Sequence, residues 1–318
     1  MLAYIFPGQG AQFVGMGRDL YDNFPSSKAI FDRADKILGF KISELCFAGP
    51  QDKLTSTENV QPAIVTVSIA ALEALKEYAK NIGCSLNLQP KFTAGLSLGE
   101  YAALVASQVL SFEDAIYLVG KRGQFMEEAA KNNPGKMLSL IGLSEEIAEE
   151  ICNDSGCEIA NLNCPGQIVI SGKIKQINQA IELAKTKEAK RAVLLDVSGA
   201  FHCSLMKEAE LKLSQEIHKF KFNAPKFPII SNVTAKQESD TSNIMANLIK
   251  QVSSSTYWQD SISFMVANQV DCFLEIGPGT VLKGLNKRIA PDAKTENLGS
   301  VEQIKSFVDT YKSQGAGI

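Results

Sequence analysis

A change of pattern partway along this chain of 318 residues limits the folds that it can adopt. Residues 1–131 alternate short apolar runs with amphipathic helical patterns, and the same style returns over residues 199–318. Residues 132–198 instead predict strands and helices in the order β-α-β-β-α-β. We therefore expect an α/β fold: a large α/β-hydrolase-like domain with a mainly parallel sheet (1–131 and 199–318), interrupted by a small ferredoxin-like subdomain (132–198).

The individual elements follow from the period of the apolar residues and from glycine and proline breaks. In the large domain we expect strands at 3–6, 92–95, 227–231 and 272–276, with helices near 26–38, 60–79, 205–220 and 243–251 and others beginning at residues 99, 111 and 281. In the small subdomain we expect four strands and two helices, the strands at 136–141, 158–162, 167–171 and 192–197 and the helices at 144–153 and 174–185.

The composition is that of an ordinary globular protein, with 45% hydrophobic and 21% charged residues. Because 32 basic and 35 acidic residues give a net charge of −3, we expect no general attraction to nucleic acid or to an anionic membrane. The chain lacks a signal-peptide pattern and an apolar run of the ~20 residues that a membrane span needs. The seven cysteines include no C-x-x-C pair, so we expect no metal site, no disulfide framework and a cytoplasmic location.

A candidate nucleophile is Ser97, in the segment Gly95-Leu96-Ser97-Leu98-Gly99. This G-x-S-x-G follows a predicted strand and precedes a predicted helix, which is the context of a nucleophile elbow. Small residues are needed on both sides because the serine main chain is held in a sharp turn. The N-terminal N–H groups of the next helix then face negative charge that forms on a substrate. A strand-to-helix turn with an incidental serine would give the same pattern.

A serine nucleophile needs a base at neutral pH, and the chain has two histidines. His218 lies in a predicted helix rich in Lys and Glu, which is typical of a solvated surface side chain. His202 lies where the chain passes from the small subdomain to the large domain, and clefts between domains are common places for sites. His202 is therefore the candidate base. Its alternative interpretation is a hydrogen-bonded interior histidine.

Arg122 is a candidate binding residue for an anion. In the predicted helix that begins at Ser111, it shares one face with the apolar residues Ala115, Leu118, Val119 and Met126. A guanidinium on such a face needs an anionic partner or a route to water, and a substrate carboxylate suits its two parallel donors. An internal salt bridge or a side chain that extends to solvent is the alternative.

Two glycine-rich turns follow predicted strands. In Pro7-Gly8-Gln9-Gly10-Ala11-Gln12, main-chain N–H groups are placed to face the elbow as oxyanion donors. This turn has no lysine and is not a phosphate loop. Gly277-Pro278-Gly279 lacks the third glycine of a dinucleotide fingerprint, so we expect no nucleotide-phosphate binding.

Six motifs occur in order along nearly the whole chain. They are Phe6-Pro7-Gly8-Gln9-Gly10-Ala11-Gln12, Gly95-Leu96-Ser97-Leu98-Gly99-Glu100, Lys121-Arg122-Gly123, Asn161-Leu162-Asn163-Cys164-Pro165-Gly166-Gln167, Gly199-Ala200-Phe201-His202 and Glu275-Ile276-Gly277-Pro278-Gly279. Together they resemble the malonyl-CoA:acyl carrier protein transacylase family, the acyltransferases of fatty acid and polyketide synthesis. That family has a large α/β domain with a ferredoxin-like insertion.

The resemblance implies a ping-pong transfer that supplies malonyl units for fatty acid synthesis. Ser97 would attack the thioester of malonyl-CoA, and CoA would leave. The phosphopantetheine thiol of acyl carrier protein would then take the malonyl group. His202 would act as base and then as acid. Malonyl-CoA and acyl carrier protein are thus the expected partners of a monomeric enzyme that needs no cofactor of its own.

The resemblance also implies roles around the two reacting residues. The main-chain N–H groups of Gln9 and Leu98 would form the oxyanion hole. Arg122 would clamp the malonyl carboxylate, and the main-chain carbonyl of Gln251 would orient His202, a weaker orienting group than the aspartate of a Ser-His-Asp triad.

Three further residues are expected to shape the binding cleft, two of them from the resemblance and Phe201 from its place beside His202. Asn163 and Gln167 would line it from the small subdomain. Phe201 would crowd a branched α-carbon, so malonyl is predicted over methylmalonyl.

The chain departs from the family pattern at three places. Leu96 stands where the family usually has histidine before the nucleophile. Ser255-Thr256-Tyr257-Trp258 replaces the usual Pro-Val-Arg-Trp, and Thr280 stands where lysine is common. The nucleophile itself is not affected, but the local loop and one positive contact are expected to differ.

Two other classes of function share some of these features. An α/β-hydrolase esterase or thioesterase also carries G-x-S-x-G, but it has an acid between the serine and a usually C-terminal histidine, and an inward arginine has no role in the hydrolysis of neutral esters. A binding module for the carrier protein without catalysis would have no need of Ser97, His202 and Arg122 together.

Overall fold

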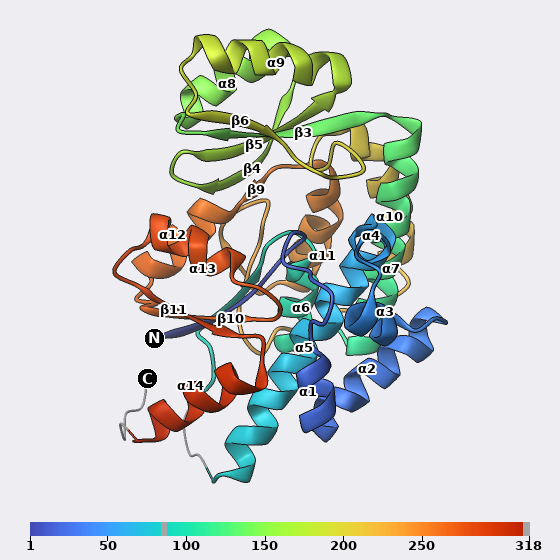
Figure 1. Cartoon of the computed structure of the whole chain (residues 1–318), viewed down its shortest axis with the longest axis vertical. Helices are drawn as coiled ribbons and strands as arrows, with labels where there is room; N and C mark the ends of the chain where they lie inside the picture. Colours follow the sequence, from blue (N-terminus) through green and yellow to red (C-terminus); the bar gives the residue numbers. More distant parts are fainter. Residues whose placement is uncertain (84–87, 314–318) are drawn as a thin grey trace.

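The structure is a computed structural model that describes residues 1–83 and 88–313. Figure 1 shows a larger part below and a smaller part above. The larger part is built on a six-stranded sheet and the smaller on a five-stranded sheet. The mixed α/β class predicted from the sequence is confirmed.

The strands of the larger sheet come from distant parts of the chain. Their order is β11 (Lys294–Leu298), β10 (Cys272–Ile276), β1 (Leu2–Phe6), β2 (Phe92–Gly95), β7 (Ile229–Ile230) and β8 (Gln237–Glu238). Neighbouring strands from β11 to β7 are parallel, and only the edge strand β8 pairs antiparallel among the described residues. Phe6 at the end of β1 is in register with Gly95 at the end of β2, so the loops that follow these strands start side by side.

Helices cover both faces of this sheet. They are α1 (Arg18–Asn23), α2 (Pro25–Leu38), α3 (Ile42–Ala48), α4 (Gln51–Thr55), α5 (Thr57–Asn81), α6 (Gly99–Ala106), α7 (Phe112–Asn132), α10 (Lys207–Ile217), α11 (Thr241–Lys250), α12 (Trp258–Ala267), α13 (Val281–Ile289) and α14 (Val301–Ser313). Two short 3-10 helices lie at Ser204–Met206 and Gln251–Ser253.

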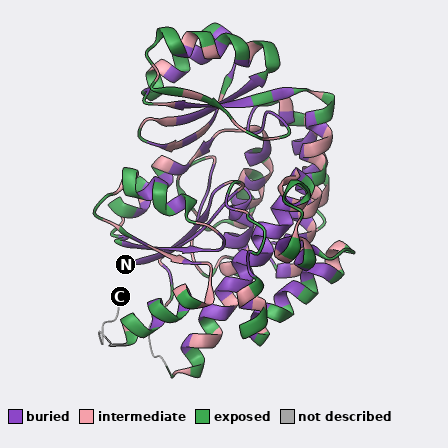
Figure 2. Ribbon diagram, viewed as in Figure 1, coloured by how far each residue is buried: buried purple, intermediate pink, exposed green. Residues whose placement is uncertain are grey.

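The side chains of β1 alternate between two apolar clusters, as a strand buried on both faces requires. Tyr4 and Phe6 pack with residues of α2, α5 and α7, whereas Ala3 and Ile5 pack with residues of α12 and α13. Figure 2 shows these strands and much of α5 as buried. The central strands and the loops at their carboxyl ends therefore rest on a closed core.

The smaller part has the predicted element order. Its sheet runs β6 (Arg191–Leu194), β3 (Gly135–Ile141), β5 (Gln167–Lys173), β4 (Glu158–Cys164) and β9 (Thr256–Tyr257), and α8 (Glu145–Ser155) and α9 (Ile174–Thr186) pack on it. The expectation of four strands was wrong by one. The fifth strand, β9, comes from the large domain and pairs in parallel with β4. Two residues are too few to give a period in the sequence.

Element bounds agree best where the apolar signal is strong. β2 and β10 have the predicted bounds, whereas the predicted strand 192–197 ends at Leu194 and the predicted strand 227–231 is confined to Ile229–Ile230. Residues 195–197 instead line a cavity between the two parts of the molecule. Among the described residues, no helix is both long and apolar enough to cross a membrane.

Candidate active site

Ser97 lies in the turn between β2 and α6 with a positive φ of 53°. A Cβ atom on Gly95 would lie 2.0 Å from the carbonyl carbon of Gly99, and one on Gly99 would lie 2.3 Å from the carbonyl oxygen of Phe6. Both approaches are closer than atoms can come, so only glycine fits on either side of the serine. The sharp turn predicted from the G-x-S-x-G segment is therefore present.

The structure brings Ser97 and His202 together across 105 positions of the chain. The Oγ atom of Ser97 lies 2.8 Å from Nε2 of His202. On the other side of the ring, Nδ1 lies 2.9 Å from the main-chain oxygen of Gln251, at the end of α11. This is the geometry of a nucleophile, a base and an orienting group.

His202 is held in the uncharged form. Burial, with the nearby Arg122 acting in the same direction, lowers its pKa to about 4. Because the carbonyl of Gln251 can only accept a hydrogen bond, Nδ1 carries the proton. Nε2 is then free to accept the hydroxyl proton of Ser97.

Arg122, on α7, is buried and points at Ser97. One terminal nitrogen donates to Oγ of Ser97 at 3.0 Å and to Oε1 of Gln251 at 3.0 Å, and the other donates to Oε1 of Gln61 at 2.6 Å. Within the described ranges no carboxylate forms an ion pair with it, and its Nε–H has no partner. The internal salt bridge that the sequence left open is therefore absent within the described residues. The buried guanidinium of Arg122 bonds only to the neutral side chains of Ser97, Gln61 and Gln251.

Ser97 lines a cavity of about 330 Å³ between the two parts of the molecule. Every predicted site residue except Gln251 lines this cavity: Gln9, Ser97, Leu98, Arg122, Asn163, Gln167, Phe201 and His202. The remaining walls are mainly apolar and include Met126, Met137, Val169, Leu195, Val281 and Leu285. An apolar cavity with a few converging polar groups is typical of a small-molecule site.

The predicted oxyanion donors lie in the two loops that start side by side after β1 and β2. Gln9 follows β1, and Leu98 directly follows the nucleophile. A Cβ on Gly8 would lie 2.5 Å from the carbonyl oxygen of Leu96, so glycine allows the first loop to approach the elbow. The two loops that carry the predicted oxyanion donors therefore lie in close contact at this point.

Sequence reasoning missed three buried polar residues around the site. Glu100 and Asn232 hydrogen-bond to each other behind the elbow, and Gln61 binds Arg122. Glu100 had a signal, since it directly follows the G-x-S-x-G segment. Asn232 and Gln61 had none, because each contacts residues far away in the chain. His218 is exposed and bonds to the carbonyl of Ser214, as expected for a surface histidine.

Comparison with known proteins decides the family. The model of the acyl transferase domain matches residues 3–301. This chain belongs to the acyl transferase family. Among curated relatives of this acyltransferase, the malonyl CoA-acyl carrier protein transacylase of Bacillus subtilis (strain 168) is 44% identical over 318 residues, 98% of each chain. That of Staphylococcus aureus (strain MSSA476) is 44% identical over 310 residues, 96% of this chain and 97% of the relative.

Solved structures agree with the family. An acyl-carrier-protein-S-malonyltransferase from Bartonella henselae superposes with a TM-score of 0.92 and 40% identity, covering 97% of this chain and 98% of that one. A malonyl-transacylase in complex with the acyl carrier protein of a type II polyketide synthase superposes with a TM-score of 0.91 and 35% identity, covering 97% and 99%. The resemblance drawn from the six motifs is confirmed.

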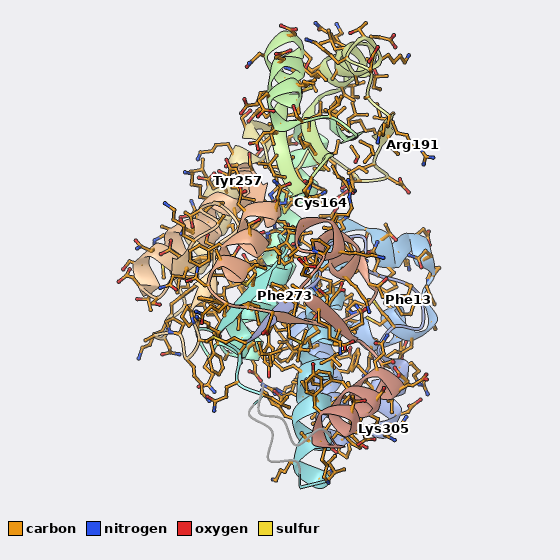
Figure 3. The ribbon with its side chains drawn as sticks, turned by 90° about the vertical axis from the view of Figure 1, so that its left-hand side faces the viewer. Phe13, Cys164, Arg191, Tyr257, Phe273 and Lys305 are labelled. Atoms are coloured by element: carbon orange, nitrogen blue, oxygen red, sulfur yellow. The ribbon has the colours of Figure 1, made fainter. Side chains whose placement is uncertain are left out.

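The structure shows what two of the departures from the family pattern contact. Leu96 joins the apolar cluster around Trp258 and lines the cavity. Within the unusual segment after Gln251, Thr256 and Tyr257 form β9, and the hydroxyl of Ser255 donates to the carbonyl of Ile159 at 2.6 Å. Figure 3 shows Tyr257 of β9 and Cys164 of β4 at the level where the two parts meet.

Proposed function

We propose that this acyltransferase moves the malonyl group of malonyl-CoA to the phosphopantetheine thiol of acyl carrier protein through a malonyl-serine intermediate. One observation carries the proposal. A single hydroxyl, that of Ser97, is hydrogen-bonded both to a neutral imidazole and to a buried guanidinium. The first activates a nucleophile, and the second suits an acyl group that ends in a carboxylate.

In the first half-reaction, Oγ of Ser97 attacks the thioester carbonyl while Nε2 of His202 takes the hydroxyl proton. The carbonyl oxygen becomes an oxyanion between the N–H groups of Gln9 and Leu98. The C–S bond then breaks, and His202 returns the proton to the sulfur, so CoA leaves as a thiol. The malonyl group stays on the serine as an ester.

The second half-reaction runs the same steps with another thiol. His202 takes the proton of the phosphopantetheine thiol, the thiolate attacks the serine ester, and the proton returns to Oγ of Ser97. Throughout, Arg122 holds the malonyl carboxylate. Phe201 leaves little room beside the α-carbon, which favours malonyl over methylmalonyl, and Asn163 and Gln167 contact the acyl or pantetheine chain from the opposite wall.

We propose further that the enzyme acts as a monomer in the cytoplasm and supplies malonyl units for fatty acid synthesis. It needs no cofactor because the thioester bond of the substrate is already activated.

The proposal extends to the fold of the two parts. The smaller part is ferredoxin-like, supported by the strand order β6-β3-β5-β4, and the larger part is α/β-hydrolase-like, supported by the parallel sheet and the elbow after β2. The predicted domain bounds 1–131, 132–198 and 199–318 belong to the same proposal.

The two rival functions predict different products. A thioesterase would pass the acyl group to water, and the buried Arg122 beside the nucleophile would have no use with a neutral acyl chain. A binding module without catalysis would form no acyl-serine at all.

Intact-protein mass after brief exposure to malonyl-CoA tests all three functions. Wild type should gain one malonyl group that holo acyl carrier protein removes, and Ser97→Ala should gain none. An adduct that water removes equally fast would support the thioesterase, and the absence of an adduct would support the binding module.

A further inference from the structure

The described residues place one buried carboxylate, that of Glu100, behind the nucleophile. Glu100 is the second residue of α6 and is 2% exposed. Its Oε2 atom accepts hydrogen bonds from Nδ2 of Asn232 and from Nε2 of Gln251, each at 2.6 Å. It also accepts from the main-chain N–H of Asn232 at 3.3 Å. Two side-chain amides from separate segments of the chain therefore converge on one oxygen.

The first amide fixes the main chain of the nucleophile. Because a carboxylate can only accept, Asn232 must turn its NH2 group toward Glu100 and its oxygen the other way. That oxygen accepts the N–H of Ser97 at 2.8 Å, and the NH2 group also donates to the carbonyl of Gly95 at 2.6 Å. Asn232 thus holds both ends of the strained turn in which Ser97 has a positive φ.

The second amide fixes the base and the cation. By the same rule Gln251 turns Nε2 toward Glu100 and Oε1 toward Arg122, which donates to it at 3.0 Å. Nε2 also donates to the carbonyl of Ser97 at 3.1 Å. The main-chain oxygen of the same residue holds His202. The side chain of Gln251 therefore links Glu100 to Arg122, and its main-chain oxygen links Glu100 to the imidazole of His202.

Glu100 also supplies charge near Arg122. Burial disfavours the charged form of both groups, and each favours the charged form of the other. The amide of Gln251 lies between them, so the guanidinium keeps donors for a ligand instead of closing on the carboxylate. A direct ion pair would satisfy Arg122 and leave less of it to bind a substrate.

We infer that Glu100 is a positioning residue of the transfer reaction, which sets Ser97 through Asn232 and sets Arg122 and His202 through Gln251. Glu100 touches no reacting atom itself. The inference rests on the proposed function for its malonyl readout, but its effect on Ser97 does not.

Two variants test this inference. Glu100→Gln keeps the shape and can donate as well as accept, so it no longer dictates the orientation of the two amides. Glu100→Asp keeps the charge, but a side chain shorter by one methylene cannot keep both bonds. Asp35→Asn is the matched control, because Asp35 is another buried carboxylate whose partners, such as Ser43, lie outside the site.

All kcat/KM values and labelling rates are compared per folded enzyme molecule. For malonyl-CoA, both Glu100 variants should lose roughly tenfold or more in kcat/KM, as expected when a hydrogen bond to a charged group is lost. The ratio of malonyl-CoA to acetyl-CoA should fall, because Arg122 is less well aimed. In an Arg122→Ala background, Glu100→Gln should leave that ratio unchanged. Labelling of Ser97 by a fluorophosphonate should slow in both variants and not in Asp35→Asn.

Several outcomes would overturn the inference. Wild-type labelling and wild-type selectivity in folded Glu100→Gln would reduce the residue to a structural role. Full activity in Glu100→Asp would show that charge alone matters. If wild type transfers no malonyl group while Glu100→Gln still slows labelling, the proposed function fails and the positioning of Ser97 stands.

Discussion

The Nδ1 atom of His202 lies 2.9 Å from a neutral main-chain oxygen, that of Gln251. Where a triad has a carboxylate, this site has a carbonyl, which stabilises an imidazolium less. Burial lowers the pKa of His202 to about 4, against the opposing effect of the hydrogen bond to Gln251. The imidazole is therefore uncharged at neutral pH, which is the form that the proposed mechanism requires of a base.

The pH dependence of acylation should report two groups. His202 must be uncharged to accept a proton, so its protonation should abolish the rate only as the pH falls toward about 4. Burial raises the pKa of Glu100 to about 7, against the opposing effect of Arg122, so a partial loss should occur as the pH falls through about 7. We expect kcat/KM profiles in which Glu100→Gln lacks the upper step. A step near the ordinary histidine value of 6.5 in that variant would contradict the low pKa of His202.

Replacing Arg122 by alanine should cost far more with malonyl-CoA than with acetyl-CoA. A charge-assisted bond to the carboxylate contributes about 1.5–3 kcal/mol, so roughly ten- to hundredfold of kcat/KM should be lost for malonyl alone. Arg122→Lys serves as the control, since it keeps the charge without the second donor. Its kcat/KM for malonyl-CoA should lie between those of wild type and Arg122→Ala. Equal losses on both thioesters would remove the carboxylate clamp.

Replacing Phe201 by alanine should admit methylmalonyl-CoA. Pocket discrimination of one methyl group is about 10–200-fold, and most of it should disappear when the ring beside His202 is removed. The measurement is the ratio of kcat/KM for the two thioesters. Met137→Ala, which enlarges the same cavity at another wall, should leave the ratio nearly unchanged. Comparable wild-type values for the two substrates would refute the prediction.

Gly99→Ala should destabilise the elbow, because its Cβ would meet the carbonyl oxygen of Phe6 at 2.3 Å. We expect a loss of at least ~2 kcal/mol in the free energy of unfolding and little labelling of Ser97. Gly284→Ala is the matched control in α13, where nothing lies within 4 Å of the added Cβ. That variant should gain about 0.5–1 kcal/mol through helix propensity. Denaturant titration of both variants measures the difference.

The sequence predicted what local patterns determine. The turn between β2 and α6 was predicted because strand, glycines and helix are neighbours in the chain. The β-α-β-β-α-β order was predicted because the pattern of apolar residues over 132–198 differs from that of the flanking segments. Eight of the nine predicted site residues line one cavity, and the ninth, Gln251, holds His202 from behind. The assignment of most of them came from family motifs, since spacing alone does not bring residues 97 and 202 together.

What the sequence did not predict depends on distant contacts. Asn232 binds Glu100 across 132 positions, and Gln251 binds it across 151. Asn232 lies outside every predicted element, and the resemblance assigned Gln251 a role only for its main-chain carbonyl. No local pattern therefore indicated that either side-chain amide binds Glu100. The strand β9 was not predicted either, because two residues are too few to show a period.

The pairing of β9 with β4 has a consequence for how this enzyme can be taken apart. In sequence the small subdomain is one continuous insertion, but its sheet is completed by residues that follow Gln251. A chimera that exchanged only residues 132–198 would set a foreign β4 against the native β9. A mismatch there would displace Thr256 and, through the short connection, Gln251. We therefore expect the position of His202, which Gln251 holds, to change more than that of Ser97. The unit of exchange is therefore the insertion together with the loop that holds the base.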